Sequence, residues 1–160
     1  MDAEHHYRGL IESLTPEELD QLKQAVTQRI SKEGNSLMAT YFDVERAAQC
    51  IDEWSKAGNV LKIYYDDTFS GIFAFDITQS WWSKIPVIAE ICIFSLGNVA
   101  GLQRFALAYM HEVAKQFPAI ILAGGCIFQQ HPQMVTNCYK RMGFTETYPT
   151  YTKVMRNDNR

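Results

Sequence analysis

The twenty residues AEICIFSLGNVAGLQRFALA, from Ala89 to Ala108, constrain the fold more than any other stretch of this chain. Within them, the apolar run Val87–Ser95 predicts a buried strand. Two glycines then turn the chain, and residues 103–117 place apolar side chains at helical spacing. A strand, a loop and a helix in this order are a building unit of α/β sheets. Glu90 is the exception, because it places a carboxylate inside the predicted strand.

A strong helix signal precedes this region, near the N-terminus. Thr15 can cap the helix, Pro16 suits its first position, and Glu18 lies three residues after the cap. The stretch SKEGNS then predicts a linker at residues 31–36. We therefore divide the chain into an N-terminal helical extension with its linker, residues 1–36, and a main domain, residues 37–160. The helix carries one apolar stripe, formed by Leu19, Leu22, Val26 and Ile30.

In the main domain, segments with strand-like patterns are interspersed with segments with helix-like patterns. A helix follows the potential cap Asp43, and a further helix begins at Pro132. The pattern from residue 59 to residue 77 predicts an antiparallel hairpin with its turn at Asp66–Gly71. The order predicts a mixed α/β sheet with a crossover helix between its fourth and fifth strands. Other strands are expected at Leu37–Phe42, at residues 119–128 and from Phe144 to Met155.

Composition argues against several classes of protein. Of the 160 residues, 47% are hydrophobic, which predicts a packed domain rather than a disordered chain. The formal net charge is -3 and no run of Lys or Arg occurs, so a nucleic-acid surface is disfavoured. No apolar run is long enough to span a bilayer, and the N-terminus has no signal pattern. The four cysteines lack CxxC spacing, so we expect a cytoplasmic protein with reduced thiols and no metal.

Two segments resemble the GNAT-type N-acetyltransferases. In that family a strand and loop are followed by Gln/Arg-x-x-Gly-x-Gly/Ala opening a helix, and Gln103–Ala108 falls at that place. The second segment, CYKRMGFTETY, is similar to the family's helix-then-strand ending, where an aromatic residue stands four positions before Gly-Phe. Tyr139, Gly143 and Phe144 match this ending. The likeness covers residues 37–155 and leaves the N-terminal helix outside it.

The resemblance implies a fold and a cosubstrate. The fold is a mixed, mostly antiparallel central sheet flanked by helices, here with an extra N-terminal helix. The cosubstrate is acetyl-CoA, whose pyrophosphate would lie against the N–H groups that open the helix. Ala106 stands where the family has glycine, so this pyrophosphate loop is degenerate. The implied cofactor-binding residues are Gln103, Arg104, Phe105, Ala106, Leu107 and Ala108, with the backbone of Ile93 and Phe94 for the pantetheine arm or thioester oxygen.

The resemblance also implies two catalytic residues. Members that modify histones carry a glutamate after an alanine in the equivalent strand, and Ala89-Glu90 matches this placement. Glu90 would take the proton of the attacking amine, because an amine attacks only when neutral and desolvation raises the pKa of a carboxyl. Tyr139 would give the departing thiolate a proton or a hydrogen bond. The implied activity is transfer of an acetyl or other short acyl group from coenzyme A to an amine.

Each of these features also has a structural interpretation. The two alanines of the QRFALA motif could simply let helix and strand pack closely. Glu90 could be a charge at the rim of the sheet, paired with Lys84 or Lys62, and Tyr139 could pack on the sheet. The alternative function is a GNAT-like fold without catalysis that serves as a structural or protein-binding module. The apolar stripe of the N-terminal helix could then dock a partner chain or a second copy.

Other chemistry has weaker support in the sequence. Cys126 with His131, and Cys92 with His111, could suggest a cysteine nucleophile, but neither pair has a local signature. The adjacent histidines His5-His6 lack further metal ligands. The Trp81-Trp82 pair, like Tyr148 and Tyr151, could form the rim of a substrate entrance, a part of the core or an oligomer contact.

Overall fold

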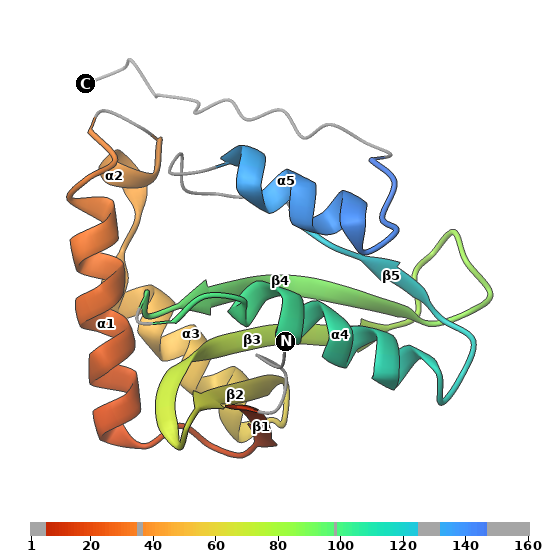
Figure 1. Ribbon diagram of the computed structural model, residues 1–160, viewed down its shortest axis with the longest axis horizontal. Helices are drawn as coiled ribbons and strands as arrows, with labels where there is room; N and C mark the ends of the chain where they lie inside the picture. The colour runs from red at the N-terminus through yellow and green to blue at the C-terminus, as the bar shows by residue number, and fades with distance from the viewer. Residues whose placement is uncertain (1–5, 35–36, 98, 125–131, 147–160) are drawn as a thin grey trace, which may run out of the picture.

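The computed structural model describes residues 6–34, 37–97, 99–124 and 132–146. Its sheet has the strand order β1-β2-β3-β4-β5 within these residues and carries helices on both faces (Figure 1). Neighbouring strands are antiparallel except β4 and β5, which run parallel. The expected mixed, mostly antiparallel sheet is confirmed. Its elements are β1 (Tyr7–Ile11), α1 (Pro16–Ile30), α2 (Leu37–Tyr41), α3 (Val44–Lys56), β2 (Val60–Tyr65), β3 (Thr68–Thr78), β4 (Val87–Ser95), α4 (Leu102–Ala114), β5 (Ile120–Leu122) and α5 (Pro132–Arg141).

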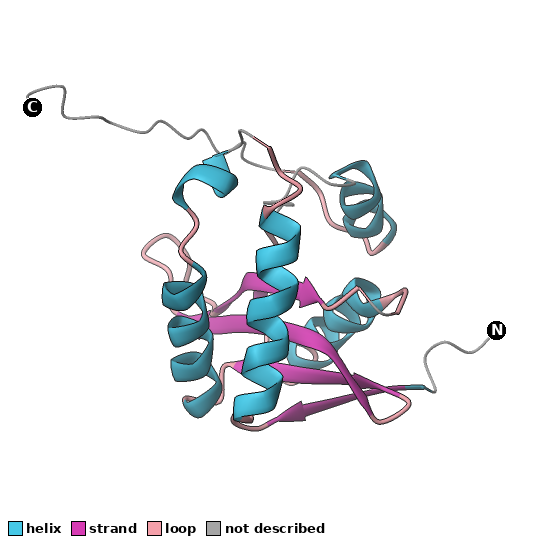
Figure 2. Cartoon of the chain, turned by 90° about the vertical axis from the view of Figure 1, so that its left-hand side faces the viewer, coloured by secondary structure: helices cyan, strands magenta, loops and turns pink. Residues whose placement is uncertain are grey.

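The central strands divide their side chains between two cores. Ile72 and Ala74 pack on one face of the sheet, where α1 and α3 lie, and we name this the α1–α3 core. Phe73 and Phe75 pack on the opposite face against α4, and we name this the α4 core. This alternation follows from the two-residue period of a strand. Figure 2 shows α3 and α4 on opposite sides of the sheet.

Local sequence signals account for the helix starts. Thr15 and Glu18 form the expected capping box, in which each side chain accepts a hydrogen bond from the other residue's backbone N–H. The Asp43 carboxylate accepts from the backbone N–H of Arg46 at 2.9 Å and caps α3. These contacts satisfy N–H groups that have no acceptor within their own helix.

Two local predictions were wrong. The segment at Leu37–Tyr41 forms the short helix α2 rather than a strand, since it connects α1 to α3 away from the strand order and a lone strand would leave its backbone groups unsatisfied. The hairpin is confirmed, but its turn is shorter than expected. Asp66 and Asp67 both have positive φ, 45° and 60°, which fits a two-residue hairpin turn. Gly71 lies within β3 instead.

The strand β1 was not expected from the sequence. It pairs antiparallel with β2, so residues before α1 complete one edge of the sheet. The apolar stripe of α1 packs inward, where Leu22 and Val26 are buried in the α1–α3 core. The stripe is therefore covered by this chain's own residues. The division of the chain after residue 36 stays a prediction.

The C-terminal predictions fall partly outside the described residues. Cys126, His131 and the final strands beyond residue 146 lie there, as do Tyr148 and Tyr151. Of the strand expected at residues 119–128, the structure describes β5 at Ile120–Leu122. Among the described residues, no helix has the length and apolar character needed to cross a membrane.

Candidate active site

Strands β4 and β5 are paired over only three residues each. Val87–Ala89 pairs with Ile120–Leu122, and the described residues show no pairing of these strands beyond that point. The next residue of β4 is Glu90. After β5, the backbone N–H of Gly124 donates a hydrogen bond to the Glu90 carboxylate. The carboxylate therefore lies directly beyond the described pairing of the two parallel strands.

A bulge in β4 follows directly after Glu90. Phe75 of β3 pairs with Glu90, whereas Ala74 pairs with Cys92, so Ile91 has no partner in β3. Directly opposed residues of a sheet point to the same face, and Phe75 belongs to the α4 core. Glu90 therefore lies on the α4 side of the sheet. A bulge is a common way to redirect a side chain at a functional site.

Glu90 is not a rim charge paired with a lysine. Its carboxylate accepts a hydrogen bond of 2.6 Å from the hydroxyl of Tyr139 in α5. Lys62 is 3% exposed and pairs with Glu18 at 3.2 Å, while Lys84 is exposed. The described residues contain no ion pair to Glu90. Burial raises the pKa of the Glu90 carboxyl from 4.5 to about 7, against the lowering effect of its hydrogen bonds.

Tyr139 joins three elements of the fold. Burial, followed by the nearby Glu90 charge, raises its pKa well above the usual value of a phenol. The side chain of Gln103, in the first turn of α4, hydrogen-bonds the same hydroxyl and lowers that pKa. Since the single O–H of Tyr139 donates to Glu90, the Gln103 amide is the donor to the phenol oxygen. The order Gln103, Tyr139, Glu90 thus forms one chain of hydrogen bonds across α4, α5 and β4.

The N-terminus of α4 has the features of an anion site. Gly101 precedes the helix with a φ of 90° and offers no side-chain cap, and the first turn has no acidic residue. First-turn N–H groups and the helix dipole favour a negative ligand there. Phe105 lies in this turn but stacks on Tyr7 with a ring separation of 5.2 Å. The Tyr7 hydroxyl donates to the carbonyl of Ala100, so β1 holds the loop that leads into α4.

The remaining predicted cofactor residues differ in exposure. Arg104 is exposed, whereas Ala106 and Leu107 are fully buried in the α4 core and Ala108 is half-buried. Buried side chains leave backbone groups as the means by which these residues would contact a cofactor. Ile93 packs against the α4 core, and Phe94 lies in the α1–α3 core. Ile93 and Phe94 pair regularly with β3, beyond the bulge.

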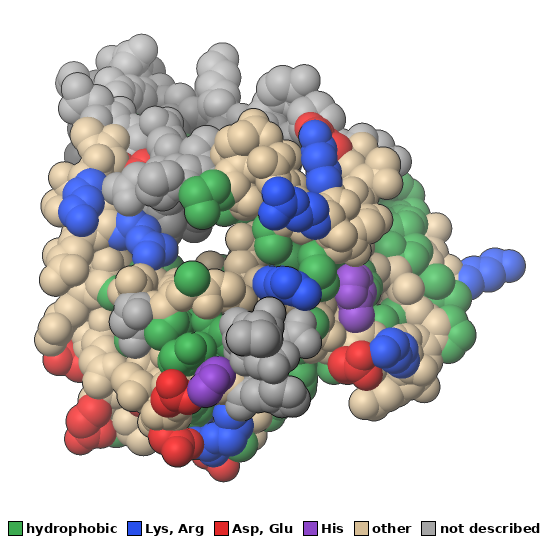
Figure 3. Space-filling view, viewed as in Figure 1, with side chains coloured by type: hydrophobic (Ala, Val, Ile, Leu, Met, Phe, Trp, Pro, Cys, Tyr) green, Lys and Arg blue, Asp and Glu red, His purple; other side chains and the backbone are tan. Residues whose placement is uncertain are grey.

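Basic side chains from α4 and α5 lie near Cys138 of α5. Arg104 of α4 and Arg141 of α5 both lower the pKa of the Cys138 thiol, which burial raises, so both guanidinium groups lie near Cys138. Figure 3 shows several Lys and Arg side chains on this face of the molecule. Arg141 was not expected at the site from the sequence. Nothing in its spacing indicates that α5 brings it beside α4.

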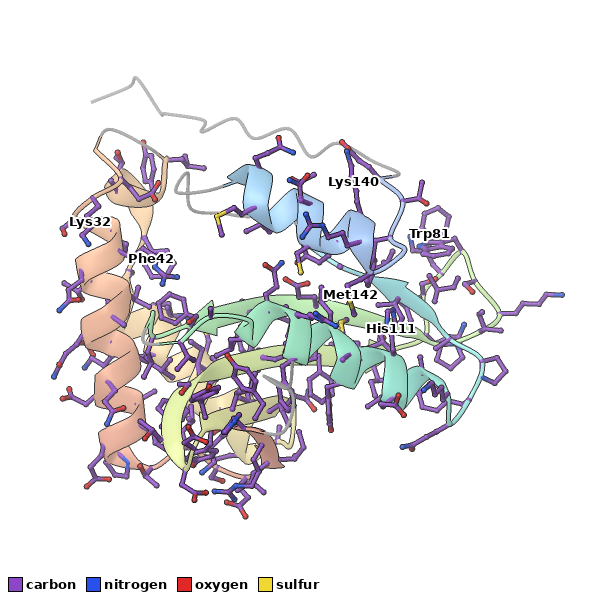
Figure 4. The ribbon with its side chains drawn as sticks, in the orientation of Figure 1. Lys32, Phe42, Trp81, His111, Lys140 and Met142 are labelled. Carbon is purple, nitrogen blue, oxygen red and sulfur yellow. The ribbon has the colours of Figure 1, made fainter. Side chains whose placement is uncertain are left out.

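The cysteines and histidines of the described residues show no nucleophilic pair. Burial, then the Glu90 charge, raises the pKa of Cys92 to about 11, which keeps the thiol protonated. His111, which is labelled in Figure 4, stacks on Phe144 at a ring separation of 5.6 Å. No group of His, Cys, Asp and Glu suited to a metal occurs in the described part of the chain. Trp81 is 96% exposed, which excludes it from the core.

This chain is similar in fold to solved structures, although its sequence matches neither a family model nor a curated protein. A possible acetyltransferase from Clostridium difficile 630 superposes with a TM-score of 0.62 and 10% identity, over 94% of this chain and 99% of the other. Aminoglycoside N-acetyltransferase AAC(6')-Iy in complex with CoA superposes with a TM-score of 0.61 and 12% identity, over 94% of this chain and 95% of the other.

A third match is Arabidopsis thaliana Naa50 in complex with the bisubstrate analogue CoA-Ac-MVNAL. It superposes with a TM-score of 0.57 and 18% identity, over 89% of this chain and 85% of the other. Identities this low establish the fold and leave the activity to be argued from the site. The strand order, the parallel pairing of β4 with β5 and the superpositions agree: this chain has the fold of the GNAT-type N-acetyltransferases.

Proposed function

We propose that this protein transfers an acetyl or other short acyl group from coenzyme A to an amine. One observation carries the proposal: the half-buried Glu90 carboxylate and the Tyr139 hydroxyl lie 2.6 Å apart, directly beyond the described pairing of β4 with β5. Two titratable groups with shifted pKa values in contact are typical of acid–base catalysis. Solved structures with this fold carry acetyltransferase names, which agrees with the proposal.

Glu90 has the properties of a general base. A carboxyl with a pKa of about 7 is largely ionised at neutral pH and still takes a proton more readily than an ordinary glutamate. In our proposal the neutral amine attacks the thioester carbon directly, and Glu90 accepts the proton that the nitrogen loses. Tyr139 supplies a hydrogen-bond donor for the departing sulfur.

The residues at the start of α4 fit the phosphates of coenzyme A. The turn lacks acidic residues and a side-chain cap, and Phe105 is turned away against Tyr7. Arg104 adds a positive charge at the same turn. The methyl group of Ala106 is buried in the α4 core, so it faces away from a ligand at the helix terminus. The degenerate motif is therefore compatible with a pyrophosphate here.

The acceptor is an amine of a small molecule or a protein. The structures with the same fold include an aminoglycoside acetyltransferase and a protein bound to a peptide-containing bisubstrate analogue. Both kinds of acceptor expose an amine that is protonated at neutral pH. A base such as Glu90 serves either kind.

Binding and transfer test the proposal separately. Acetyl-CoA should raise the melting temperature, because a ligand of the folded state stabilises it by mass action. Release of coenzyme A thiol, followed with a panel of amines, should fall by at least about 100-fold in Glu90→Gln and in Tyr139→Phe. Glu112→Gln is a matched control, because Glu112 is exposed on α4. No melting shift at millimolar acetyl-CoA, or unchanged transfer by both variants, would contradict the proposal.

The alternative, a GNAT-like module without catalysis, is not supported. A structural role gives no reason to hold a carboxylate with a pKa near 7 against a half-buried phenol. Such an arrangement lowers the stability of the fold at neutral pH. The apolar stripe of α1, which could have docked a partner, packs within this chain.

A further inference from the structure

The two proposed catalytic groups are bonded to each other, which restricts what each can do alone. Tyr139 has one hydroxyl proton, and in this structure it lies on the 2.6 Å hydrogen bond to Glu90. Gln103 donates to the same oxygen, and the backbone N–H of Gly124 donates to the carboxylate. A departing sulfur would therefore meet a phenol whose proton is already engaged.

Tyr139 alone is a poor acid for that sulfur. A thiol has a pKa of about 8.5, far below the raised pKa of this buried phenol. Loss of the phenol proton would leave a tyrosinate beside the Glu90 carboxylate, two negative charges in a buried place. Glu90 in its protonated form, with a pKa of about 7, is a stronger acid than the thiol. Proton transfer from Glu90 to the sulfur is therefore favourable, provided that Tyr139 conducts it.

We propose that Glu90 and Tyr139 form a proton relay in which uptake of the amine's proton by Glu90 is coupled to delivery of the Tyr139 hydroxyl proton to the sulfur. Gln103 is the positioning residue of this relay, because its amide holds the phenol oxygen from the α4 side. The inference rests on the proposed function and deepens it. It replaces a separate base and acid with one hydrogen-bonded unit.

For a neutral amine, the step balances without a proton from solvent. The neutral amine's nitrogen bonds to the thioester carbon, the carbon–sulfur bond breaks, and its electron pair stays on sulfur. The nitrogen's proton passes to Glu90, the proton of Glu90 passes to the Tyr139 oxygen, and the original phenol proton passes to sulfur. The products are an amide and a free thiol, with a carboxylate and a phenol restored. An ammonium substrate gives one further proton to solvent before it attacks.

The hydrogen bonds set the direction of the phenol proton during this step. When Glu90 is protonated it becomes a donor, so the Tyr139 oxygen accepts from both Glu90 and Gln103. Both lone pairs of that oxygen are then used, and its own proton must point elsewhere, toward the sulfur. The other titratable groups nearby are the buried thiol of Cys92 beside Glu90 and Cys138 beside Tyr139. The guanidinium groups of Arg104 and Arg141 lie near Cys138.

A double-mutant cycle tests the relay. In a relay, either substitution blocks the same coupled proton transfer. The rate of acyl transfer should therefore fall by the same factor, within about threefold, in Glu90→Gln, in Tyr139→Phe and in the double variant. Losses that multiply, about 100-fold each and about 10,000-fold together, would overturn the relay and leave separate base and acid roles. Absence of transfer in the unmodified protein would instead refute the proposed function. Acetyl-CoA-induced melting shifts check that each variant folds and binds.

The role of Gln103 has its own test. Gln103→Met removes the donor and keeps the length of the side chain, so kcat should fall about tenfold or more with an unchanged KM for acetyl-CoA. Gln116→Met is the matched control, because Gln116 is exposed just beyond α4. A raised KM with unchanged kcat would assign Gln103 to cofactor binding and overturn its positioning role.

A solvent-isotope experiment tests the number of protons that move. The rate of acetyl transfer, plotted against the deuterium fraction of the solvent, should curve because two protons move in the same step. A linear plot would contradict the relay.

Discussion

Replacing Glu90 with glutamine should stabilise the folded protein at pH 8 and give no gain at pH 4. Burial raises the carboxyl's pKa from 4.5 to about 7. The difference corresponds to about 3 kcal/mol of folding free energy. Its sign follows from proton binding, because the folded state holds this proton more tightly than the unfolded chain. Ionised Glu90 therefore destabilises the fold above pH 7, and this effect disappears as the pH falls to 4.5.

Glutamine removes the charge but does not match every contact. Its carbonyl oxygen can still accept from the Tyr139 hydroxyl, whereas its amide N–H groups gain no acceptor, at a cost of about 1 kcal/mol. The net stabilisation at pH 8 is then about 2 kcal/mol, which corresponds to a rise of roughly 4–8 °C in Tm for a chain of this size. At pH 4 only the amide cost remains, so the variant should be slightly less stable.

Urea denaturation at pH 8, 6 and 4 measures this difference directly. The matched control Glu112→Gln changes an exposed pair with Lys115, so it should shift stability by no more than about 0.5 kcal/mol at any of these pH values. A stability difference between Glu90→Gln and the unmodified protein that is the same at all three pH values would refute the reasoning.

In the unmodified protein, kcat/KM should rise through pH 7, with roughly a tenth of the plateau value at pH 6.

Three further predictions concern the framework of the site. Gly71→Ala should destabilise the fold by about 3 kcal/mol, because a Cβ there would lie 2.2 Å from the carbonyl oxygen of Phe94, and an unchanged urea midpoint would contradict this. Tyr7→Phe should cost about 1 kcal/mol and raise KM for acetyl-CoA, because it removes the hydrogen bond to Ala100 before α4; steady-state kinetics with an unaltered KM would disagree. Burial raises the pKa of Glu18, but its hydrogen bonds lower that pKa by more, so the net shift is downward. Ionised Glu18 therefore stabilises the fold above pH 4.5, and this contribution is lost at lower pH. Glu18→Gln should flatten the acid side of the measured curve of stability against pH.

Much of the fold is predictable from short stretches of the sequence. The Thr15 capping box, the Asp43 cap and the β4 strand all rely on residues a few positions apart, and the structure confirms each. The candidate site was predictable only through a resemblance. Glu90 and Tyr139 could be named as candidates, but their contact spans 49 positions and no local pattern encodes it.

The sequence by itself determined the helix starts, the buried strands and the presence of a carboxylate among apolar residues, because these depend on local hydrogen bonds and on the period of apolar side chains. Only the tertiary structure decided that β1 joins the sheet, that α2 is a helix, and that a bulge at Ile91 follows Glu90. Pairing between distant segments fixes these features. The raised pKa of Glu90 has the same origin, because its desolvation comes from tertiary packing around a position that the sequence alone leaves open.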